Sequence, residues 1–125
     1  MTGPLDDVPP TEQLMTITRE DRGRCQVLTV RGEVDLSTGE RLRSTVNTAL
    51  QRALGQPVIL DLSPVDFLSS SGLGQLVALD EEARGMMTSL RIVVDPDRHV
   101  IRPITTMGLD DVLSLYRTVD EAVAG

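Results

Sequence analysis

The sequence predicts a single α/β domain with the element order ββαβαβαβα, and three observations carry this prediction. Two strand patterns joined by the short glycine-containing link EDRGR predict an antiparallel hairpin near the N-terminus. Apolar runs then alternate with helical patterns, which predicts a mainly parallel sheet joined by right-handed crossovers and flanked by helices. The length of 125 residues fits one domain with a sizeable core.

The first twelve residues differ in composition from the rest of the chain. Residues 1–12 contain three prolines and few apolar side chains, so we expect a flexible tail there. Residues 13–125 contain no internal repeat, low-complexity tract or linker. We therefore expect one domain over residues 13–125.

Five segments have the patterns of strands. The hairpin is expected from residues 14–18 and 25–34, with Gly32 marking a bulge or the end of the second strand. The later apolar runs are short, as is typical of strands buried in a parallel sheet. They cover residues 58–62 (VILDL), 90–94 (LRIVV) and 112–116 (VLSLY).

The first two helices have clear start and stop signals. Ser37 is expected to cap the first helix, with Glu40 completing a capping box and Gly55 ending the helix. Its apolar stripe is formed by Leu42, Val46, Ala49, Leu50 and Ala53. A second helix is expected from Ser71 to about residue 84, where Gly85 follows.

Two helical segments follow the strand at residues 90–94. The first covers residues 100–107, and Pro103 is expected to kink or break it. The second is a short helix through residue 124, opened by a capping box of Thr118 and Glu121. Function in parallel sheets gathers at the carboxyl ends of strands, which here carry the expected loops GEVDLST, SPVDFLSSSG and DPDR.

The composition disfavours several kinds of site. The net charge is −7, with 19 acidic residues against 12 basic ones, which disfavours direct nucleic-acid binding and anionic lipid surfaces. All the bases are arginines, so a lysine Schiff base and the P-loop lysine are impossible. One histidine and one cysteine leave no histidine-pair metal site, disulfide or thiolate zinc site. We expect no metal and no cofactor, and a buried Cys25 without a regulatory role.

Two further features concern the location of the protein. No apolar run approaches the roughly 20 residues of a membrane span. The acidic, proline-rich N-terminus lacks the pattern of a signal peptide. We therefore expect a reduced, cytoplasmic protein without membrane insertion.

The stretch FLSSSGLG, residues 67–74, allows four interpretations: a phosphate-binding loop, a serine nucleophile, a helix cap or a surface for modification. P-loop spacing and GxGxxG are absent, which disfavours nucleotide binding. The nucleophile elbow G-x-S-x-G is also absent, and His99 is the only imidazole in the sequence. We therefore expect that the protein is not an enzyme. Ser69 or Ser70 would suffice to cap a helix.

Two features of this stretch go beyond a helix cap. Its three hydroxyls exceed what capping needs, and Gly72 and Gly74 each cost about 1 kcal/mol relative to alanine inside a helix. We expect these glycines to leave a bare surface that another protein can approach closely. A phosphoserine at a helix N-terminus is tolerated by its own fold, yet it adds nearly two negative charges to that surface.

Three motifs resemble those of a known family. VILDLSPVDFLSSSGLGQL resembles the signature of STAS domains, specifically the bacterial anti-sigma-factor antagonists, in which Asp-Ser-Ser-Gly-Leu-Gly opens a helix. GEVDLST resembles the family's Gly-Glu-Leu-Asp loop, and MGLDDVLSLY resembles the Gly-Leu run before its last strand. The resemblance covers residues 14–124 and implies a compact sheet flanked by helices.

The resemblance also implies a phosphorylation switch. In the family, an unphosphorylated antagonist binds an anti-sigma factor with serine kinase activity and frees a sigma factor. That kinase phosphorylates the first serine of Ser-Ser-Gly, and a PP2C-type phosphatase removes the phosphate. The implied acceptor here is Ser70, with Ser69, which replaces the family's aspartate, and Ser71 as alternative acceptors. The implied partner interface consists of Asp35, Ser70, Ser71, Gly72 and Gly74.

Two other functions stay open at this point. Some STAS domains are accessory subunits of transporter complexes, and co-purification with an ATPase subunit would favour that role. A nucleotide-binding signalling module is a third hypothesis, which the missing lysine disfavours and which calorimetry with GTP and ATP would test. In the leading hypothesis, the acceptor serine is exposed and lies at the carboxyl end of the strand at residues 58–62.

Overall fold

The computed structural model describes residues 14–125, so the tail expected for residues 1–12 lies outside the described residues. Within them, one mixed sheet has the strand order β1-β2-β3-β5-β6, and β4 also pairs with β2. β1 pairs antiparallel with β2, and all other pairs are parallel. The strands are β1 Met15–Arg22, β2 Cys25–Val34, β3 Val58–Asp61, β4 Val65–Leu68, β5 Leu90–Val93 and β6 Ser114–Tyr116.

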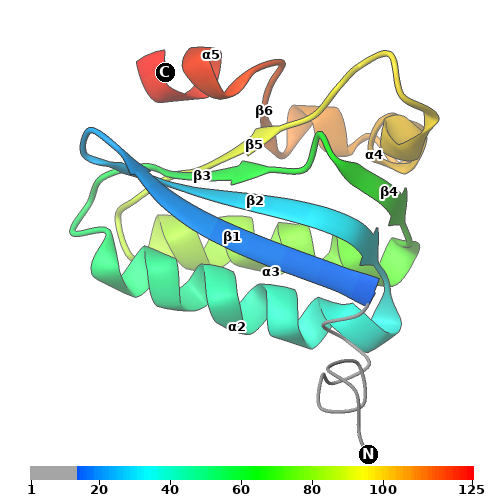
Figure 1. Ribbon diagram of the computed structural model, residues 1–125, viewed down its shortest axis with the longest axis horizontal. Coiled ribbons are helices and arrows are strands. Elements are labelled where there is room, and N and C mark those ends of the chain that lie inside the picture. The colour runs from blue at the N-terminus through cyan, green and yellow to red at the C-terminus, as the bar shows by residue number, and fades with distance from the viewer. Residues whose placement is uncertain (1–13) are drawn as a thin grey trace, which may run out of the picture.

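Helices cover both faces of this sheet (Figure 1). α2 and α3 lie side by side on one face, over a large apolar cluster from the sheet and both helices. The short α5 lies on the opposite face, over a smaller cluster. The bounds are α2 Leu36–Arg52, α3 Ser70–Gly85, α4 Arg102–Thr106 and α5 Val119–Ala124, with 3-10 turns η2 His99–Ile101 and η3 Leu109–Asp111. The predicted fold class is confirmed.

The strand β4 is the main difference from the predicted elements, because residues 65–68 were expected to be loop. β3 and β4 pair one after the other along β2, β3 with Gln26 to Thr29 and β4 with Gly32 to Val34. β4 has only four residues, and two adjacent ones, Asp66 and Phe67, are exposed. This pattern does not alternate, so it lacks the period that identifies a strand in a sequence.

Gly32 lies at an irregularity in β2, as expected. The register between β2 and β4 shifts between Gly32 and Glu33, and Gly32 has a φ of +98°. A Cβ atom at this position would collide with the backbone oxygen of Leu14. Only glycine fits both the positive φ angle and the close approach of the backbone at Leu14.

Pro103 and Thr118 were both expected to mark helix boundaries. Pro103 divides its segment as predicted, because it lies in the first turn of α4 directly after η2, where its missing N–H is not needed. The Thr118 hydroxyl accepts from Glu121 N at 3.0 Å, but the Glu121 carboxylate accepts from Arg117 N instead of closing the capping box.

Cys25 is buried, as expected, and is a free cysteine. Within residues 14–125, no helix is both long and apolar enough to cross a membrane.

Candidate functional site

The candidate site forms where β2 and β4 end next to each other. Val34, the last residue of β2, pairs with Leu68, the last residue of β4. The next backbone N–H, that of Ser69, donates to the Val34 oxygen at 2.9 Å. Helix α2 begins two residues after Val34, and α3 begins two residues after Leu68. The starts of both helices are therefore held side by side. Ser70, the predicted acceptor, follows β4 rather than the expected strand at residues 58–62.

Asp35 caps α2, so the expectation that Ser37 and Glu40 form the capping box is wrong. The Asp35 Oδ1 atom accepts from Ser37 N at 2.9 Å and from Thr38 N at 3.2 Å. The Thr38 hydroxyl accepts from Asp35 N at 2.9 Å and closes the box. Asp35 and Ser37 can both cap a helix and lie only two positions apart. The Asp35 carboxylate takes this role because it accepts from the free N–H groups of both Ser37 and Thr38. Ser37 consequently lies inside the helix.

Ser69 caps α3, which begins one residue earlier than expected. Its hydroxyl oxygen accepts from Gly72 N at 3.1 Å. Ser69 occupies the position of the family's aspartate, and serine and aspartate are comparably good N-caps. The replacement therefore keeps the start of α3 capped.

Ser70 and Ser71 have no such structural task. Both are exposed in the first turn of α3, and neither hydroxyl hydrogen-bonds to another residue in the described part of the chain. Of the three candidate acceptors, Ser69 is thus half-buried and caps the helix, whereas Ser70 and Ser71 are exposed and their hydroxyls make no hydrogen bond within residues 14–125.

A shallow hollow of about 420 Å³ joins the two helix starts. It is lined by Asp35, Leu36, Ser37, Ser69 and Ser71. The structure therefore brings the predicted interface residue Asp35 together with the serine stretch.

Leu36 belongs to this surface, although the sequence analysis did not single it out. Its side chain is 81 % exposed in the first turn of α2. The signal was present in the sequence, because positions i+4 and i+7 from Leu36 are Glu40 and Arg43 on the exposed face of the helix. Leu36 therefore adds an exposed apolar side chain to the hollow, next to the predicted interface residue Asp35.

Gly72 and Gly74 differ, and the expectation that both leave the surface bare needs a correction. Gly72 is buried, and a Cβ atom there would lie 2.8 Å from both Cγ1 and the backbone oxygen of Val34. Gly72 therefore permits α3 to approach β2 and does not lie on the exposed surface. A Cβ atom on the exposed Gly74 would meet nothing within 4 Å. Gly74 fits the expected bare surface.

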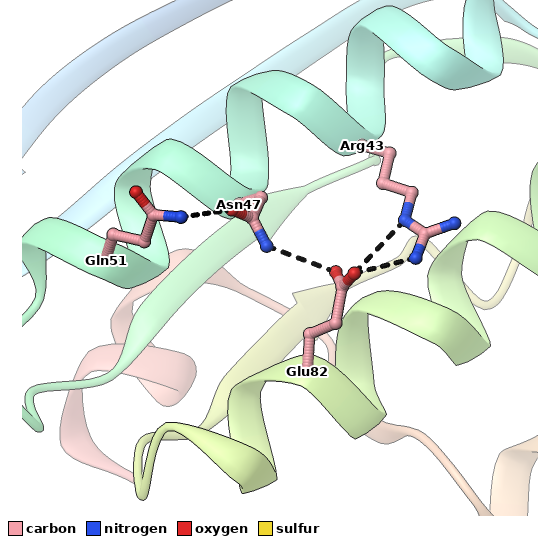
Figure 2. Close-up of polar contacts among 4 residues, drawn as sticks. All are labelled: Arg43, Asn47, Gln51 and Glu82. Carbon is pink, nitrogen blue, oxygen red and sulfur yellow. Dashed lines mark hydrogen bonds and ion pairs between the residues drawn. The ribbon is translucent and has the colours of Figure 1, made fainter.

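A polar network ties α2 to α3 behind the site (Figure 2). Glu82 of α3 accepts from Arg43 Nη2 at 2.7 Å and from Asn47 Nδ2 at 3.3 Å, and Asn47 in turn accepts from Gln51 at 2.8 Å. The hydrogen bond from Arg43 holds the pKa of Glu82 below its usual range. The network helps to fix the two helices, and hence their N-termini, relative to each other.

The charge at the site is defined by Asp35. The Ser37 hydroxyl, which donates to its carboxylate at 2.7 Å, and the N–H groups of Ser37 and Thr38 lower the pKa of Asp35. The positive ends of two helix dipoles lie at the same place. Asp35 is therefore a fixed negative charge in the hollow that it lines together with Ser71, and Ser70 precedes Ser71 in the first turn of α3.

Comparison with known proteins identifies the family. The family model for the STAS domain matches residues 16–122. The chain belongs to the STAS-domain family. The match covers nearly all of the described residues, so the sheet and its helices are those of a STAS domain.

Similar proteins include two from mycobacteria. The anti-sigma-F factor antagonist RsfB of Mycobacterium tuberculosis is 33 % identical, in an alignment that covers 89 % of this chain and 88 % of RsfB. A crystal structure of an anti-sigma factor antagonist from Mycobacterium paratuberculosis matches with a TM-score of 0.79 and 32 % identity, over 93 % of this chain and 95 % of that one. Unphosphorylated SpoIIAA from Bacillus matches with a TM-score of 0.68 over 86 % and 93 % of the two chains, and at 23 % identity this match supports the fold alone.

The contrast between the two glycines can be tested by alanine substitution. Gly72→Ala should lower the free energy of unfolding by about 1–3 kcal/mol, because the new methyl group overpacks the contact with Val34. Gly74→Ala is the matched control and should leave stability unchanged or raise it by up to about 1 kcal/mol. Denaturant unfolding measures both, and a Gly72→Ala protein as stable as the wild type would contradict the packing described here.

The capping role of Asp35 predicts a pH dependence. Because its pKa is lowered on folding, the charge contributes stability above the ordinary carboxyl pKa of about 3.9, and this contribution is lost as the pH falls through the lower folded value. Asp35→Ser keeps a neutral cap, so its melting temperature should lie below that of the wild type at neutral pH and converge with it in acid. Asp35→Ala, which has no cap, should melt at a lower temperature than the wild type at every pH. Parallel melting curves for wild type and Asp35→Ser at all pH values would refute this role.

Proposed function

We propose that this STAS domain is an anti-sigma-factor antagonist that is regulated by phosphorylation of Ser70. In its unphosphorylated form it binds an anti-sigma factor, and this binding frees a sigma factor. The anti-sigma factor acts as the serine kinase, and a PP2C-type phosphatase restores the active form. The protein acts in the cytoplasm by binding rather than by catalysis.

The observation that carries this proposal is the surface at the starts of α2 and α3. It combines two exposed serines without hydrogen bonds, the charged Asp35 and the exposed Leu36. The similarity to RsfB, which is named an anti-sigma-F factor antagonist, supports this role over that of a transporter subunit or a nucleotide-binding module. The serine motif supports Ser70 as the acceptor, and the engaged hydroxyl of Ser69 disfavours the neighbouring alternative.

Phosphorylation of Ser70 would change this surface without unfolding it. Ser70 is the first residue of α3, where the helix dipole and free N–H groups tolerate an anion. The phosphate would add between one and two negative charges at neutral pH one residue before Ser71, which lines the hollow with the charged Asp35 and the apolar Leu36. A partner that covers Leu36 would then have to desolvate a phosphate, which weakens binding.

The acceptor can be identified directly. The chain is incubated with ATP and, one at a time, with the kinase-type anti-sigma factors of its source organism, and the products are analysed by mass spectrometry. We expect one phosphate, on Ser70, and none in Ser70→Ala. The phosphorylated chain should bind the anti-sigma factor about a hundredfold more weakly, a coupling of about 3 kcal/mol.

Ser70→Ala and Ser69→Ala serve as controls for this experiment. Ser70→Ala should still bind, because its hydroxyl makes no bond within the described residues. Ser69→Ala should lose about 1 kcal/mol of stability with its cap, yet still accept the phosphate on Ser70. A phosphate on Ser69 or Ser71, or equal affinity before and after phosphorylation, would reject the proposed regulation.

The role of Leu36 in partner binding is tested by a matched pair of leucines. Leu36→Ala should weaken binding of the anti-sigma factor by about 10- to 100-fold, because burying a leucine side chain contributes roughly 1.5–3 kcal/mol. Leu54 is 90 % exposed just beyond the other end of α2, so Leu54→Ala should bind like the wild type. Calorimetry compares the two variants. Equal affinities for both would exclude Leu36 from the interface.

A further inference from the structure

A second concave surface lies away from the phosphorylation site. It is a groove of about 310 Å³ between the β1–β2 hairpin and the C-terminal half of α2. α2 packs against β2 and β3, and β1 is at the edge of the sheet. The groove shares no lining residue with the hollow at Asp35 and Ser71.

The floor of the groove is apolar and contains one fixed polar group. Ile17, Leu28 and Ala49 line it. Beside them lies Gln26, whose side chain donates to the Ala49 oxygen at 2.8 Å and accepts from Arg19 Nε at 3.1 Å. The Ala49 oxygen needs this donor because Ala53 N, its usual helical partner, donates to Leu50 instead. Gln26 is only 8 % exposed, so it holds the Arg19 guanidinium in place at the groove.

The charges of the groove are opposite in sign to those of the whole chain. The protein has a net charge of −7, yet the groove is lined by two arginines, Arg19 and Arg52, and by no acidic residue. Arg19 makes an exposed ion pair with Asp21 at 3.3 Å, which contributes little and leaves it able to bind a second anion. Arg52 makes no ion pair or side-chain hydrogen bond with any of residues 14–125.

We propose that this groove binds a small amphiphilic anion, a molecule with a short apolar part and one carboxylate or phosphate group. The apolar part packs on Ile17, Leu28 and Ala49, and the anion pairs with the guanidinium groups of Arg52 and Arg19. The volume is near the lower end for ligand sites, which indicates a small ligand. This site is independent of the proposed antagonist function.

Binding can be measured on the full chain by two-dimensional NMR with four probes. Hexanoate and hexyl phosphate carry both parts of the proposed ligand, hexanol carries only the apolar part, and inorganic phosphate carries only the anion. We expect saturable shifts of the amide signals around residues 17–19, 26–28 and 44–52 with hexanoate or hexyl phosphate. The tighter of these two probes identifies the head group. Hexanol and inorganic phosphate should bind at least tenfold more weakly.

Two arginine variants test the assignment of the anion site. Arg52→Gln should weaken binding of the tighter probe at least tenfold, while its melting temperature stays that of the wild type. Arg102→Gln removes an exposed arginine on α4, away from the groove, and should bind like the wild type. The proposal is overturned if neither amphiphile gives saturable shifts, if hexanol or inorganic phosphate binds equally well, or if the two variants behave alike.

Discussion

The parallel pairing of β4 with β2 is the constraint on which the candidate site depends. It aligns Leu68 with Val34, and the hydrogen bond from Ser69 N to the Val34 oxygen extends this alignment by one residue. A helix begins two residues after each of these strands, so the starts of α2 and α3 have to lie together. The close approach requires a residue without a side chain at position 72. A hollow that contains residues from two distant stretches of sequence follows from this pairing.

The polar residues at the two helix starts divide into a structural set and a free set. Asp35 and Ser69 each accept N–H groups of the helix that they begin, so Asp35→Ala would combine a lost cap with a lost surface charge. The hydroxyls of Ser70 and Ser71 make no hydrogen bond within residues 14–125, and Leu36 is largely exposed. The caps and the network around Glu82 hold these free groups in fixed positions. Such pre-organisation lowers the cost of ordering a surface when a partner binds.

The sequence predicted the elements with strong periodicity and missed those set by tertiary contacts. The hairpin, the buried strands and the bulge at Gly32 were predictable because their patterns and turn residues are local. The strand β4 was not, because four residues with two exposed neighbours, Asp66 and Phe67, have no readable period. The sequence located the serine stretch but could not distinguish the buried Gly72 from the exposed Gly74, because both residues have the same local preferences. That distinction depends on Val34, nearly forty residues away in the chain.

The central claim is that the starts of α2 and α3 form one binding surface. Amide chemical-shift mapping of the isotope-labelled, unphosphorylated chain during titration with an anti-sigma factor tests it most directly. We expect signals from residues 33–38 and 69–74 to change together, at the same partner concentration, while those around Leu54 and Met87 stay constant. Changes confined to one of the two stretches, or centred on Leu54 and Met87, would contradict it.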